Sequence, residues 1–421
     1  MKCRKNVRDL MPAEKAAYVQ AIIALKTTRP SIIAAAQAAG ATSRYDDYVW
    51  IHREVMGGAH TGPAFTPWHR EFLKQLERDL QDVSGNPNMT IPYWDWTTAR
   101  TAADPGWPFT NDFMGGFGTG TDNRVMTGRF AEAAGEWVLR VRTGAGPLLP
   151  NGSPNPGRDN TTYLRRNATP PTPGPPDDFP LPSQTNARNC LARTAYDAVP
   201  YLEDPATITT LAQVNPSFRK YLEYVLHNGP HGWVGGNMMP MTSPNDPVFF
   251  LHHCNIDRLW AVWQQKNAAP TTNYLPPSGT TANHDVNDNM AMLTAGNFAW
   301  PVLARPMDVQ DHRAMGFWYA SDPPLITLVS PSVSFGNVPE TLTTYRPVQF
   351  SVRTCRPVKF RITGITAGTN FSIPAAQGLV TVNHSDILDP VIGEVFVQFQ
   401  ALGPLSTTQA ATVFPDRGHR G

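Results

Sequence analysis

Six of the eleven histidines in this chain fall into two spaced triplets, which are His52, His60 and His69, and His227, His231 and His253. Within the second triplet, His227 and His231 are four residues apart, and residues at that spacing lie on the same side of a helix. Both side chains can therefore bind one ion, and His253 then arrives from the next helical segment. Neutral imidazole is a ligand for copper, zinc, iron and nickel, so the spacing predicts metal chemistry.

The kind of metal follows from what accompanies the histidines. A carboxylate-bridged di-iron bundle carries paired Glu-x-x-His motifs, and these histidines lack them. A three-histidine zinc site stays open on the residues alone, although the four cysteines form no CxxC pair that would indicate cysteine ligands. Two triplets on packed helices favour a pair of copper ions that share a ligand between them.

The metal interpretation depends on the whole set, because a lone His52 or His60 is more often a structural side chain than a ligand. Asp257, one turn after His253, is placed to accept the second ring N–H of a ligand histidine or to support a neighbouring helix. The remaining histidines lack such a set of partners and are interpreted as structural or exposed: His252, His284, His312, His384 and His419. Of these, His252 is ambiguous, because a shift of one residue in helix phase would exchange it with His253.

The histidines need helices to position them, and apolar residues recur at helical spacing around most of them. Helices are predicted after Pro12, over residues 45–56, from Thr66–Pro67 onwards, over 218–231 and over 247–265. In the third of these, Phe72 and Leu76 belong to an apolar face, and projecting that face back one turn puts His69 on it. Residues 144–188, rich in Pro and Gly, predict a long irregular excursion over the surface.

The character of the chain changes after Pro323–Pro324. Beyond that point apolar residues alternate with polar ones, as in half-buried strands, in the stretches 348–352, 358–362 and 395–399. A domain boundary is therefore placed near residue 323. Residues 1–322 are expected to form a mainly α domain with long loops, and residues 323–421 a small all-β sandwich domain.

Composition and charge exclude several classes of function. Lys and Arg number 35 against 34 Asp and Glu, a formal net charge of +1 with no long run of one sign, so a nucleic-acid partner is disfavoured. No apolar run approaches the roughly 18 residues that span a bilayer, and the first residues lack the apolar segment of a secretory signal. A soluble protein is expected, cytoplasmic or exported without a visible signal peptide, with no membrane partner.

Four segments around these histidines resemble the type 3 copper proteins, and specifically the bacterial tyrosinases. The segments are Phe65-Thr66-Pro67-Trp68-His69-Arg70, Pro92-Tyr93-Trp94-Asp95-Trp96, His227-Asn228 with His231, and the stretch from Asn245 through His252-His253 to Trp260. The resemblance spans nearly all of residues 1–322 and implies a four-helix bundle core. It also implies two copper ions with dioxygen as co-substrate, CuA held by His52, His60 and His69, and CuB held by His227, His231 and His253.

The resemblance implies an oxidoreductase that hydroxylates a phenol ortho to its hydroxyl group and oxidises o-diphenols to o-quinones. Glu223 matches a glutamate of the family that holds a water near the coppers, and Asn228 matches an asparagine that shares this water. A buried, more basic carboxylate with an orienting amide is suited to remove the phenol proton, so true monophenolase activity is expected.

Four further residues are expected around the site. Phe65 lies in the first motif, and Phe249, one turn before the last ligand histidine, is expected to pack beside CuB. Met241 is expected in the loop over the entrance, and Gly232 follows the second CuB histidine, where relatives carry a bulkier or charged residue. Together they predict an open, apolar pocket for a small phenolic substrate.

Several alternatives stay open from the sequence. The nearest is a catechol or o-aminophenol oxidase without monophenolase activity. A hemocyanin-like oxygen carrier predicts reversible oxygenation with substrate access blocked, and a zinc hydrolase predicts zinc on metal analysis. Some relatives also use a partner that helps load copper, so a copper-delivery partner is expected here. Residues 323–421 either plug the site or only stabilise the enzyme.

Overall fold

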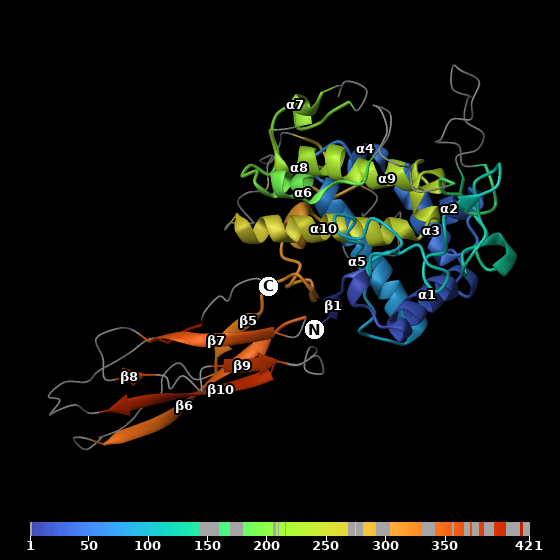
Figure 1. Cartoon of the computed structure of the whole chain (residues 1–421). Helices are drawn as coiled ribbons and strands as arrows, with labels where there is room; N and C mark the ends of the chain where they lie inside the picture. Colours follow the sequence, from blue (N-terminus) through green and yellow to red (C-terminus); the bar gives the residue numbers. More distant parts are fainter. Residues whose placement is uncertain are drawn as a thin grey trace. The chain divides into compact units, whose positions relative to one another are not determined.

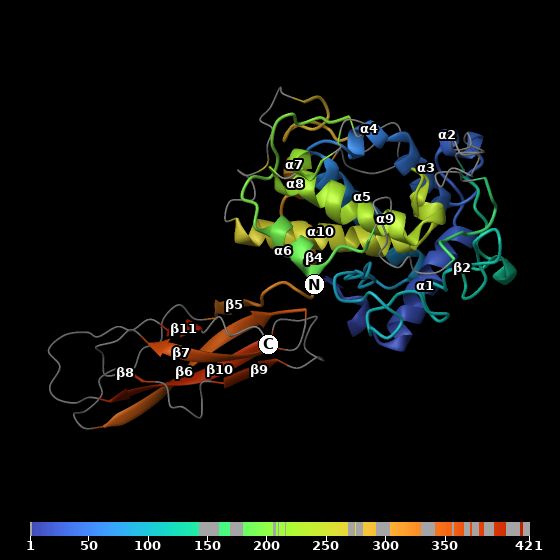
Figure 2. The ribbon, with the colours of Figure 1, turned by 45° about the horizontal axis from the view of Figure 1, so that its top comes forward.

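The three-dimensional structure is a computed structural model. It describes residues 2–142, 160–168, 180–204, 208, 210–214, 216–267, 274, 281–291, 304–329, 342–355, 358–365, 371–372, 379–382, 391–400 and 413–415. The chain divides into two compact units, Lys2–Phe317 and Trp318–Gly421. Figures 1 and 2 show the ribbon in two views, with the helices gathered in the larger unit and the long strands in the smaller one.

Helices dominate the larger unit. The α-helices are α1 (Pro12–Thr27), α2 (Ala34–Ala38), α3 (Arg44–Glu54), α4 (Met56–Ala59), α5 (Phe65–Ser84), α6 (Gln184–Leu191), α7 (Leu211–Val214), α8 (Phe218–Tyr221), α9 (Asn228–Val234) and α10 (Val248–Lys266). A π-helix, η4 (Leu222–His227), joins α8 to α9. Short 3-10 turns lie at η1 (Val7–Asp9), η2 (Glu132–Ala134), η5 (Gly236–Met238), η6 (Ser243–Asn245) and η7 (Pro306–Val309), and the short strands are β1 (Lys2–Arg4), β2 (Gly118–Thr119), β3 (Arg124–Val125) and β4 (Phe317–Tyr319).

The predicted helices are confirmed, except that two of them are divided. The helix predicted over residues 218–231 consists of α8, the π-helix η4 and α9, which ends at Val234. The segment predicted as one helix over residues 45–56 is divided, because α3 ends at Glu54 and the four-residue α4 follows. Gly57 and Gly58 lie in α4, and glycine is among the weakest helix formers. The irregular excursion predicted over residues 144–188 lies partly outside the described residues. Its last part was predicted wrongly, because residues 184–188 belong to helix α6. Ser183 caps the first turn of α6 there through its hydrogen bond from the Asn186 N–H.

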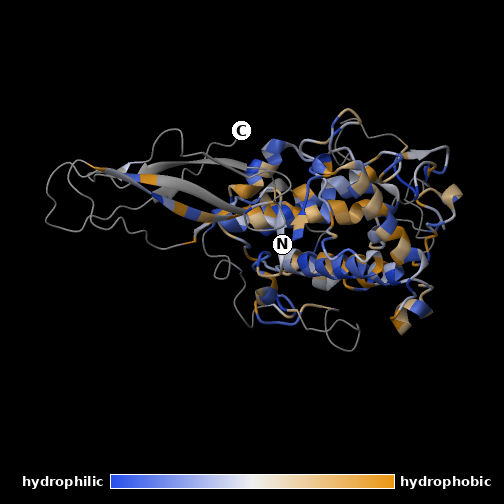
Figure 3. Cartoon of the chain, turned by 90° about the horizontal axis from the view of Figure 1, so that it is seen from below, coloured by the Kyte–Doolittle hydropathy of each residue, from blue (hydrophilic) through white to orange (hydrophobic). Residues whose placement is uncertain are grey.

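Helices α5 and α10 form the centre of the larger unit. α5 ends before Gly85, whose φ of 65° is the left-handed conformation that terminates many helices. α10 is buried along almost its whole length, which is typical of a helix inside a core. α5 packs against α1 and α10, and α10 also packs against η4. In Figure 3 the helices carry hydrophobic residues beside hydrophilic ones.

A buried ion-pair network ties α10 to α5. Asp257 on α10 accepts hydrogen bonds from Arg70 Nε at 2.6 Å and from Arg4 Nη1 at 2.9 Å. Arg4 on β1 also pairs with Glu77 of α5 at 2.7 Å. All four side chains are buried, and removing one member of a buried ion pair typically costs about 3–5 kcal/mol. The network therefore holds the two central helices in one relative position.

Antiparallel strands form the smaller unit. They are β5 (Leu325–Leu328), β6 (Thr343–Arg353), β7 (Val358–Ile365), β8 (Phe371–Ser372), β9 (Leu379–Val382), β10 (Val391–Gln400) and β11 (Val413–Pro415). One sheet has the order β5-β6-β10-β8 and a second has the order β11-β7-β9. β10 pairs with β6 from Val391 opposite Val352 to Gln400 opposite Thr343. On β6, Val348 and Phe350 are buried between more exposed neighbours, as the alternating pattern predicts.

Two remaining sequence predictions concern membranes and the last histidines. Among the residues described, no helix combines the length and the apolar character needed to cross a bilayer. His384 and His419, interpreted as structural or exposed, lie outside the described residues.

Candidate metal centre

The first histidine triplet converges in the larger unit. His52 lies on α3 and His69 on α5, whereas His60 lies in the bend that follows α4. One ring nitrogen from each of the three lies within 4.8 Å of the others. The ring centroids of His52 and His60 are 5.0 Å apart, and those of His60 and His69 are 4.9 Å apart. All three side chains are buried.

The second triplet converges in the same way. His227 ends the π-helix η4, His231 lies on α9 and His253 lies on α10. The rings of His227 and His231 are 4.5 Å apart, and His231 Nε2 lies 3.2 Å from His253 Nε2. Two imidazole nitrogens bound to one ion at about 2.0–2.1 Å in tetrahedral geometry stand roughly 3.3 Å apart. The last pair therefore already has the spacing of two ligands of one ion.

The two triplets face each other across one buried site, which we call the histidine site. The ring of His69 stacks on that of His253 with centroids 4.3 Å apart and an interplanar angle of 20°. The rings of His60 and His227 are 5.9 Å apart. The structure thus brings all six predicted residues to one place, from five helices and one bend.

Hydrogen bonds determine which nitrogen of each ring faces the histidine site. In three histidines Nδ1–H donates to a backbone carbonyl, from His52 to Met241 at 2.7 Å, from His69 to Phe65 at 2.8 Å and from His231 to Met238 at 2.6 Å. The Nε2 atoms of His52, His69 and His227 are buried without a hydrogen-bond partner among the described residues. Buried polar atoms are normally satisfied, so lone pairs directed to one place fit a site for metal ions.

Burial also sets the protonation state of these rings. It lowers the pKa of His52 to about 3 and that of His231 to about 4. Burial, with the neighbouring histidines, lowers the pKa of His69, His227 and His253 well below the usual value. Neutral imidazole is the form that binds metals, and a donor set of imidazoles alone suits copper or zinc rather than magnesium or calcium. The residues therefore fit two ions held by three imidazoles each.

His252 lies close to the second triplet, but both of its ring nitrogens are engaged. Trp96 Nε1–H donates to His252 Nδ1 at 3.1 Å, and His252 Nε2–H donates to the carbonyl of His227 at 3.1 Å. A neutral imidazole with both nitrogens so bonded has no lone pair left for a metal. Trp96 and the carbonyl of His227 thus decide that His253, and not His252, is available to a metal. The only sign of this in the sequence was the presence of Trp96 in the Pro92–Trp96 motif.

Two phenylalanines pack against the rings of the histidine site. Phe249 stacks on His253 with centroids 4.0 Å apart and lies edge-on to His52 at 4.8 Å. Phe65 lies 4.9 Å from His69 and 5.0 Å from His227, so it contacts both triplets. Both phenylalanines are fully buried. The imidazole rings of the site therefore have apolar neighbours.

Three other predicted residues make contacts of their own. Met241 is half-buried, and its backbone carbonyl orients His52. Gly232 is half-buried, and its carbonyl accepts a hydrogen bond from the side-chain amide of Asn167 at 3.3 Å. Asp257, bonded to Arg4 and Arg70, supports a neighbouring helix, which is one of the two roles considered for it.

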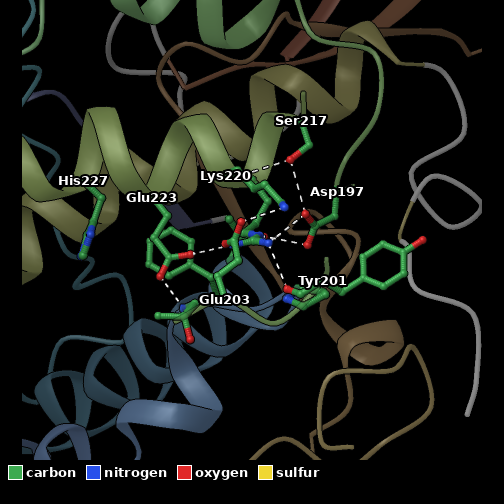
Figure 4. A network of polar contacts seen from close by, with 12 residues as sticks. Asp197, Tyr201, Glu203, Ser217, Lys220, Glu223 and His227 are labelled. Atoms are coloured by element: carbon green, nitrogen blue, oxygen red, sulfur yellow. Dashed lines mark hydrogen bonds and ion pairs between the residues drawn. The ribbon is translucent and has the colours of Figure 1, made fainter. Parts of the chain in front are cut away.

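Glu223 lies beside the site in a charged network that the sequence analysis did not anticipate. Its Oε1 accepts from the N–H of Thr61 at 2.5 Å and its Oε2 accepts from Arg219 Nη1 at 3.2 Å. Arg219 also pairs with Asp197 at 2.9 Å and with Glu203 at 2.7 Å. Figure 4 shows these contacts as dashed lines, with Glu223 on the same helical segment as His227. The sequence did contain one sign of this network, because Arg219 and Glu223 are four residues apart, the spacing at which opposite charges pair on a helix.

Burial makes Glu223 a weaker acid than an ordinary glutamate. It raises the pKa of the carboxyl group to about 7, against the opposing effects of Arg219 and of the Thr61 N–H. Asn228, the other residue expected near the water, accepts a hydrogen bond at its Oδ1 from His227 Nδ1 at 2.9 Å. The structure therefore places a carboxyl group that titrates near neutral pH and an amide close to the second triplet.

Comparison with known proteins identifies the family. The family model described as the common central domain of tyrosinase matches residues 42–266. The tyrosinase of Streptomyces glaucescens is 34% identical over 326 residues, which are 75% of this chain and 97% of that protein. The tyrosinase of Streptomyces antibioticus is 35% identical over 302 residues, 69% of this chain and 92% of that protein. The chain belongs to the tyrosinase family.

A further relative agrees with this membership. Grixazone synthase of Streptomyces griseus is 35% identical over 328 residues, 73% of this chain and 96% of that protein. A polyphenol oxidase from Thermothelomyces thermophila superimposes with a TM-score of 0.48 at 25% identity, covering 68% of this chain and 76% of that one. Tyrosinase-family enzymes are type 3 dicopper oxidoreductases that use dioxygen. The cofactor of this chain is accordingly a pair of copper ions, and the two histidine groups are able to bind them.

Proposed function

We propose that this chain hydroxylates small monophenols ortho to the hydroxyl group and oxidises o-diphenols to o-quinones. In this proposal His52, His60 and His69 hold CuA, and His227, His231 and His253 hold CuB. The observation that carries it is the stacking of His69, from one triplet, on His253, from the other, at 4.3 Å within one buried site. Because ligand rings of the two triplets are this close, two ions bound by them would lie near enough to act on one dioxygen molecule.

The bound copper pair supplies the activation of dioxygen and the transfer of electrons between dioxygen and the phenol. The chain's own residues orient and protect this chemistry. Carbonyls of Met241, Phe65 and Met238 hold three imidazoles in one tautomer, so that Nε2 faces the site. Phe65 and Phe249 exclude water and leave an apolar surface against which an aromatic ring can pack.

Glu223 is the proposed acceptor of the phenol proton. A carboxyl group with a pKa of about 7 is partly ionised at neutral pH, which suits a general base. Asn228 accepts from His227 at Oδ1, which leaves its amide N–H groups to orient a water between Glu223 and the substrate. Hydroxylation of a monophenol requires removal of its hydroxyl proton, so this role of Glu223 bears on monophenolase activity.

The proposal extends to the architecture around the site. Helices α3, α5 and α10 with the continuous segment η4–α9 form its four-helix bundle core. Residues 1–322 are the catalytic domain, and residues 323–421 are an all-β sandwich domain that stabilises it or covers the site. A separate partner delivers copper. The packing of α5 and η4 on α10 supports the bundle core, and the antiparallel strands of the smaller unit support the β domain. The copper-delivery partner is proposed from the family resemblance alone.

A comparison of one monophenol with its matching o-diphenol, on fully copper-loaded protein, tests the activity. We expect two coppers per chain and turnover of both substrates. Glu223→Gln should lower monophenol turnover more than diphenol turnover, whereas an unchanged ratio would contradict the role of Glu223 as a base. Oxidation of the diphenol alone would assign a catechol or o-aminophenol oxidase, reversible oxygenation without turnover would assign an oxygen carrier, and zinc on metal analysis would assign a hydrolase.

A further inference from the structure

Among the six histidines of the site, His60 is the one that no helix holds. The other five lie on α3, α5, η4, α9 and α10, whereas His60 lies in the bend between α4 and α5. The next residue, Thr61, has a φ of 60°, a conformation that a residue other than glycine seldom adopts. Helix geometry alone therefore does not set the direction of the His60 ring. Other contacts must hold residues 57–64, which run from within α4 to the residue before α5 and which we call the loop of residues 57–64.

The ring of His284 bridges the two ends of this loop. The N–H of Ala64 donates to His284 Nδ1 at 3.1 Å, and His284 Nε2–H donates to the carbonyl of Gly57 at 3.2 Å. Between them, a Cβ added to Gly62 would meet His284 ring atoms at 2.6 and 2.7 Å, so the ring is in close contact with the loop backbone. One imidazole thus touches the loop at both sides of His60.

His284 is itself held firmly. Its N–H donates to the carbonyl of Thr281 at 3.1 Å, and its carbonyl accepts from Tyr274 Oη at 2.6 Å. The same turn is closed by Asp285, which accepts from the N–H and the hydroxyl of Thr281 at 2.9 and 2.8 Å. His284 and Asp285 are buried. The ring therefore has a fixed backbone from which it can restrain a loop more than 200 residues away in sequence.

A second restraint acts on the same loop through Thr61. The N–H of Thr61 donates to Glu223 Oε1 at 2.5 Å, and the carbonyl of Thr61 accepts from the N–H of Glu203 at 3.0 Å. These bonds hold the peptide groups of Thr61, while His284 holds the loop ends. The two restraints together leave the loop little freedom at His60.

We propose that His284 is a positioning residue for CuA, which fixes the loop of residues 57–64 and thereby the ring of His60. This inference rests on the proposed role of His60 as a copper ligand. His284 does not bind the metal, since its two ring nitrogens are occupied by Gly57 and Ala64. Its effect is on the affinity of CuA, because a ligand that must first be ordered binds its ion less tightly.

The test titrates copper-free, full-length protein with Cu(I) in competition with a chromogenic chelator. Wild-type protein is expected to bind two coppers per chain, and fewer than two would overturn the proposed function itself. In His284→Ala, one of the two coppers should bind about 10- to 100-fold more weakly, the usual effect of losing an outer partner of a metal ligand, while the other changes little. Two coppers bound as tightly as in wild type would overturn the positioning role alone.

Matched variants separate positioning from a general loss of stability. His284→Asn keeps an acceptor near Nδ1 and His284→Gln keeps a donor near Nε2, so each should give an intermediate affinity. His312→Ala removes another buried histidine and should leave both affinities unchanged. In a His60→Ala background, His284→Ala should have no further effect on copper affinity, because it acts through His60. An equal loss in both backgrounds would overturn the proposal.

A measurement without copper covers the case in which His284→Ala folds poorly. Hydrogen exchange of the Ala64 amide is expected to be slow in wild type and in His284→Asn, which keeps its acceptor, and faster in His284→Gln. Equal exchange in all three proteins would overturn the proposed restraint of the loop.

Discussion

The raised pKa of Glu223 has a measurable effect on stability, which Glu223→Gln removes. The carboxyl group has an ordinary pKa of 4.5 in the unfolded chain and a pKa of about 7 in the buried site. That difference corresponds to about 3 kcal/mol, since a tenfold change in proton affinity is worth 1.36 kcal/mol. The folded protein therefore binds this proton more tightly than the unfolded chain does.

The sign of the effect follows from proton linkage. Between pH 4.5 and 7 the folded protein keeps a proton on Glu223 that the unfolded chain has released, so stability falls as the pH rises through that window. Glutamine has no proton to lose. The stability of wild type relative to Glu223→Gln should thus fall by about 3 kcal/mol between pH 4 and pH 8, with most of the change complete near pH 7.

Urea denaturation followed by tryptophan fluorescence measures this difference at each pH. Copper-free protein is used, because metal and protons compete for the imidazoles. The buried histidines titrate too, but both proteins carry them and their contribution cancels in the difference. Glu54→Gln, at an exposed glutamate, is the control and should differ from wild type by a constant amount within about 0.5 kcal/mol. A flat difference for Glu223→Gln, or one of opposite sign, would refute the reasoning.

Further predictions follow from other contacts of the site. His69→Ala is expected to bind one copper per chain instead of two, as measured by metal analysis after dialysis, and retention of both coppers would remove His69 from the ligand set. Asp257→Ala leaves two buried arginines without their shared carboxylate, so it should lower the free energy of unfolding by about 3–5 kcal/mol, and a loss below about 1 kcal/mol would contradict the network. Trp96→Phe removes the indole N–H that His252 accepts and should cost about 1–3 kcal/mol while both coppers still bind. Loss of a copper in that variant would instead favour His252 as a ligand.

Much of the metal centre was predictable from local patterns. The spacing of His227 and His231 and the apolar face that carries His69 both follow from the 3.6-residue period of a helix, which acts over a few residues. The observed bounds of α5 and α10 agree with that reasoning. The alternating strands after residue 323 follow in the same way from the two-residue period of a strand.

The repeat of apolar residues along the sequence did not predict where a helix is interrupted. The helix expected over residues 45–56 ends at Glu54, and His60 lies in an irregular loop whose restraint comes from His284. A histidine with no partner in its own neighbourhood gives no sequence signal for such a role. Its partners, Gly57 and Ala64, are more than 200 residues away, and only the folded chain brings them together.

The sequence by itself determined which of the helical histidines are able to converge, because helix periodicity sets the face on which a side chain lies. His60 lies in no helix. The tertiary structure decided which ring nitrogens remain available to a metal. His252 and His253 are neighbours on one helix, yet Trp96 and the carbonyl of His227 occupy both nitrogens of the first. Likewise the acidity of Glu223 depends on burial and on Arg219 and Thr61. Hydrogen bonding and desolvation depend on which atoms are close in space, whatever their distance along the chain. A local sequence pattern therefore does not predict them.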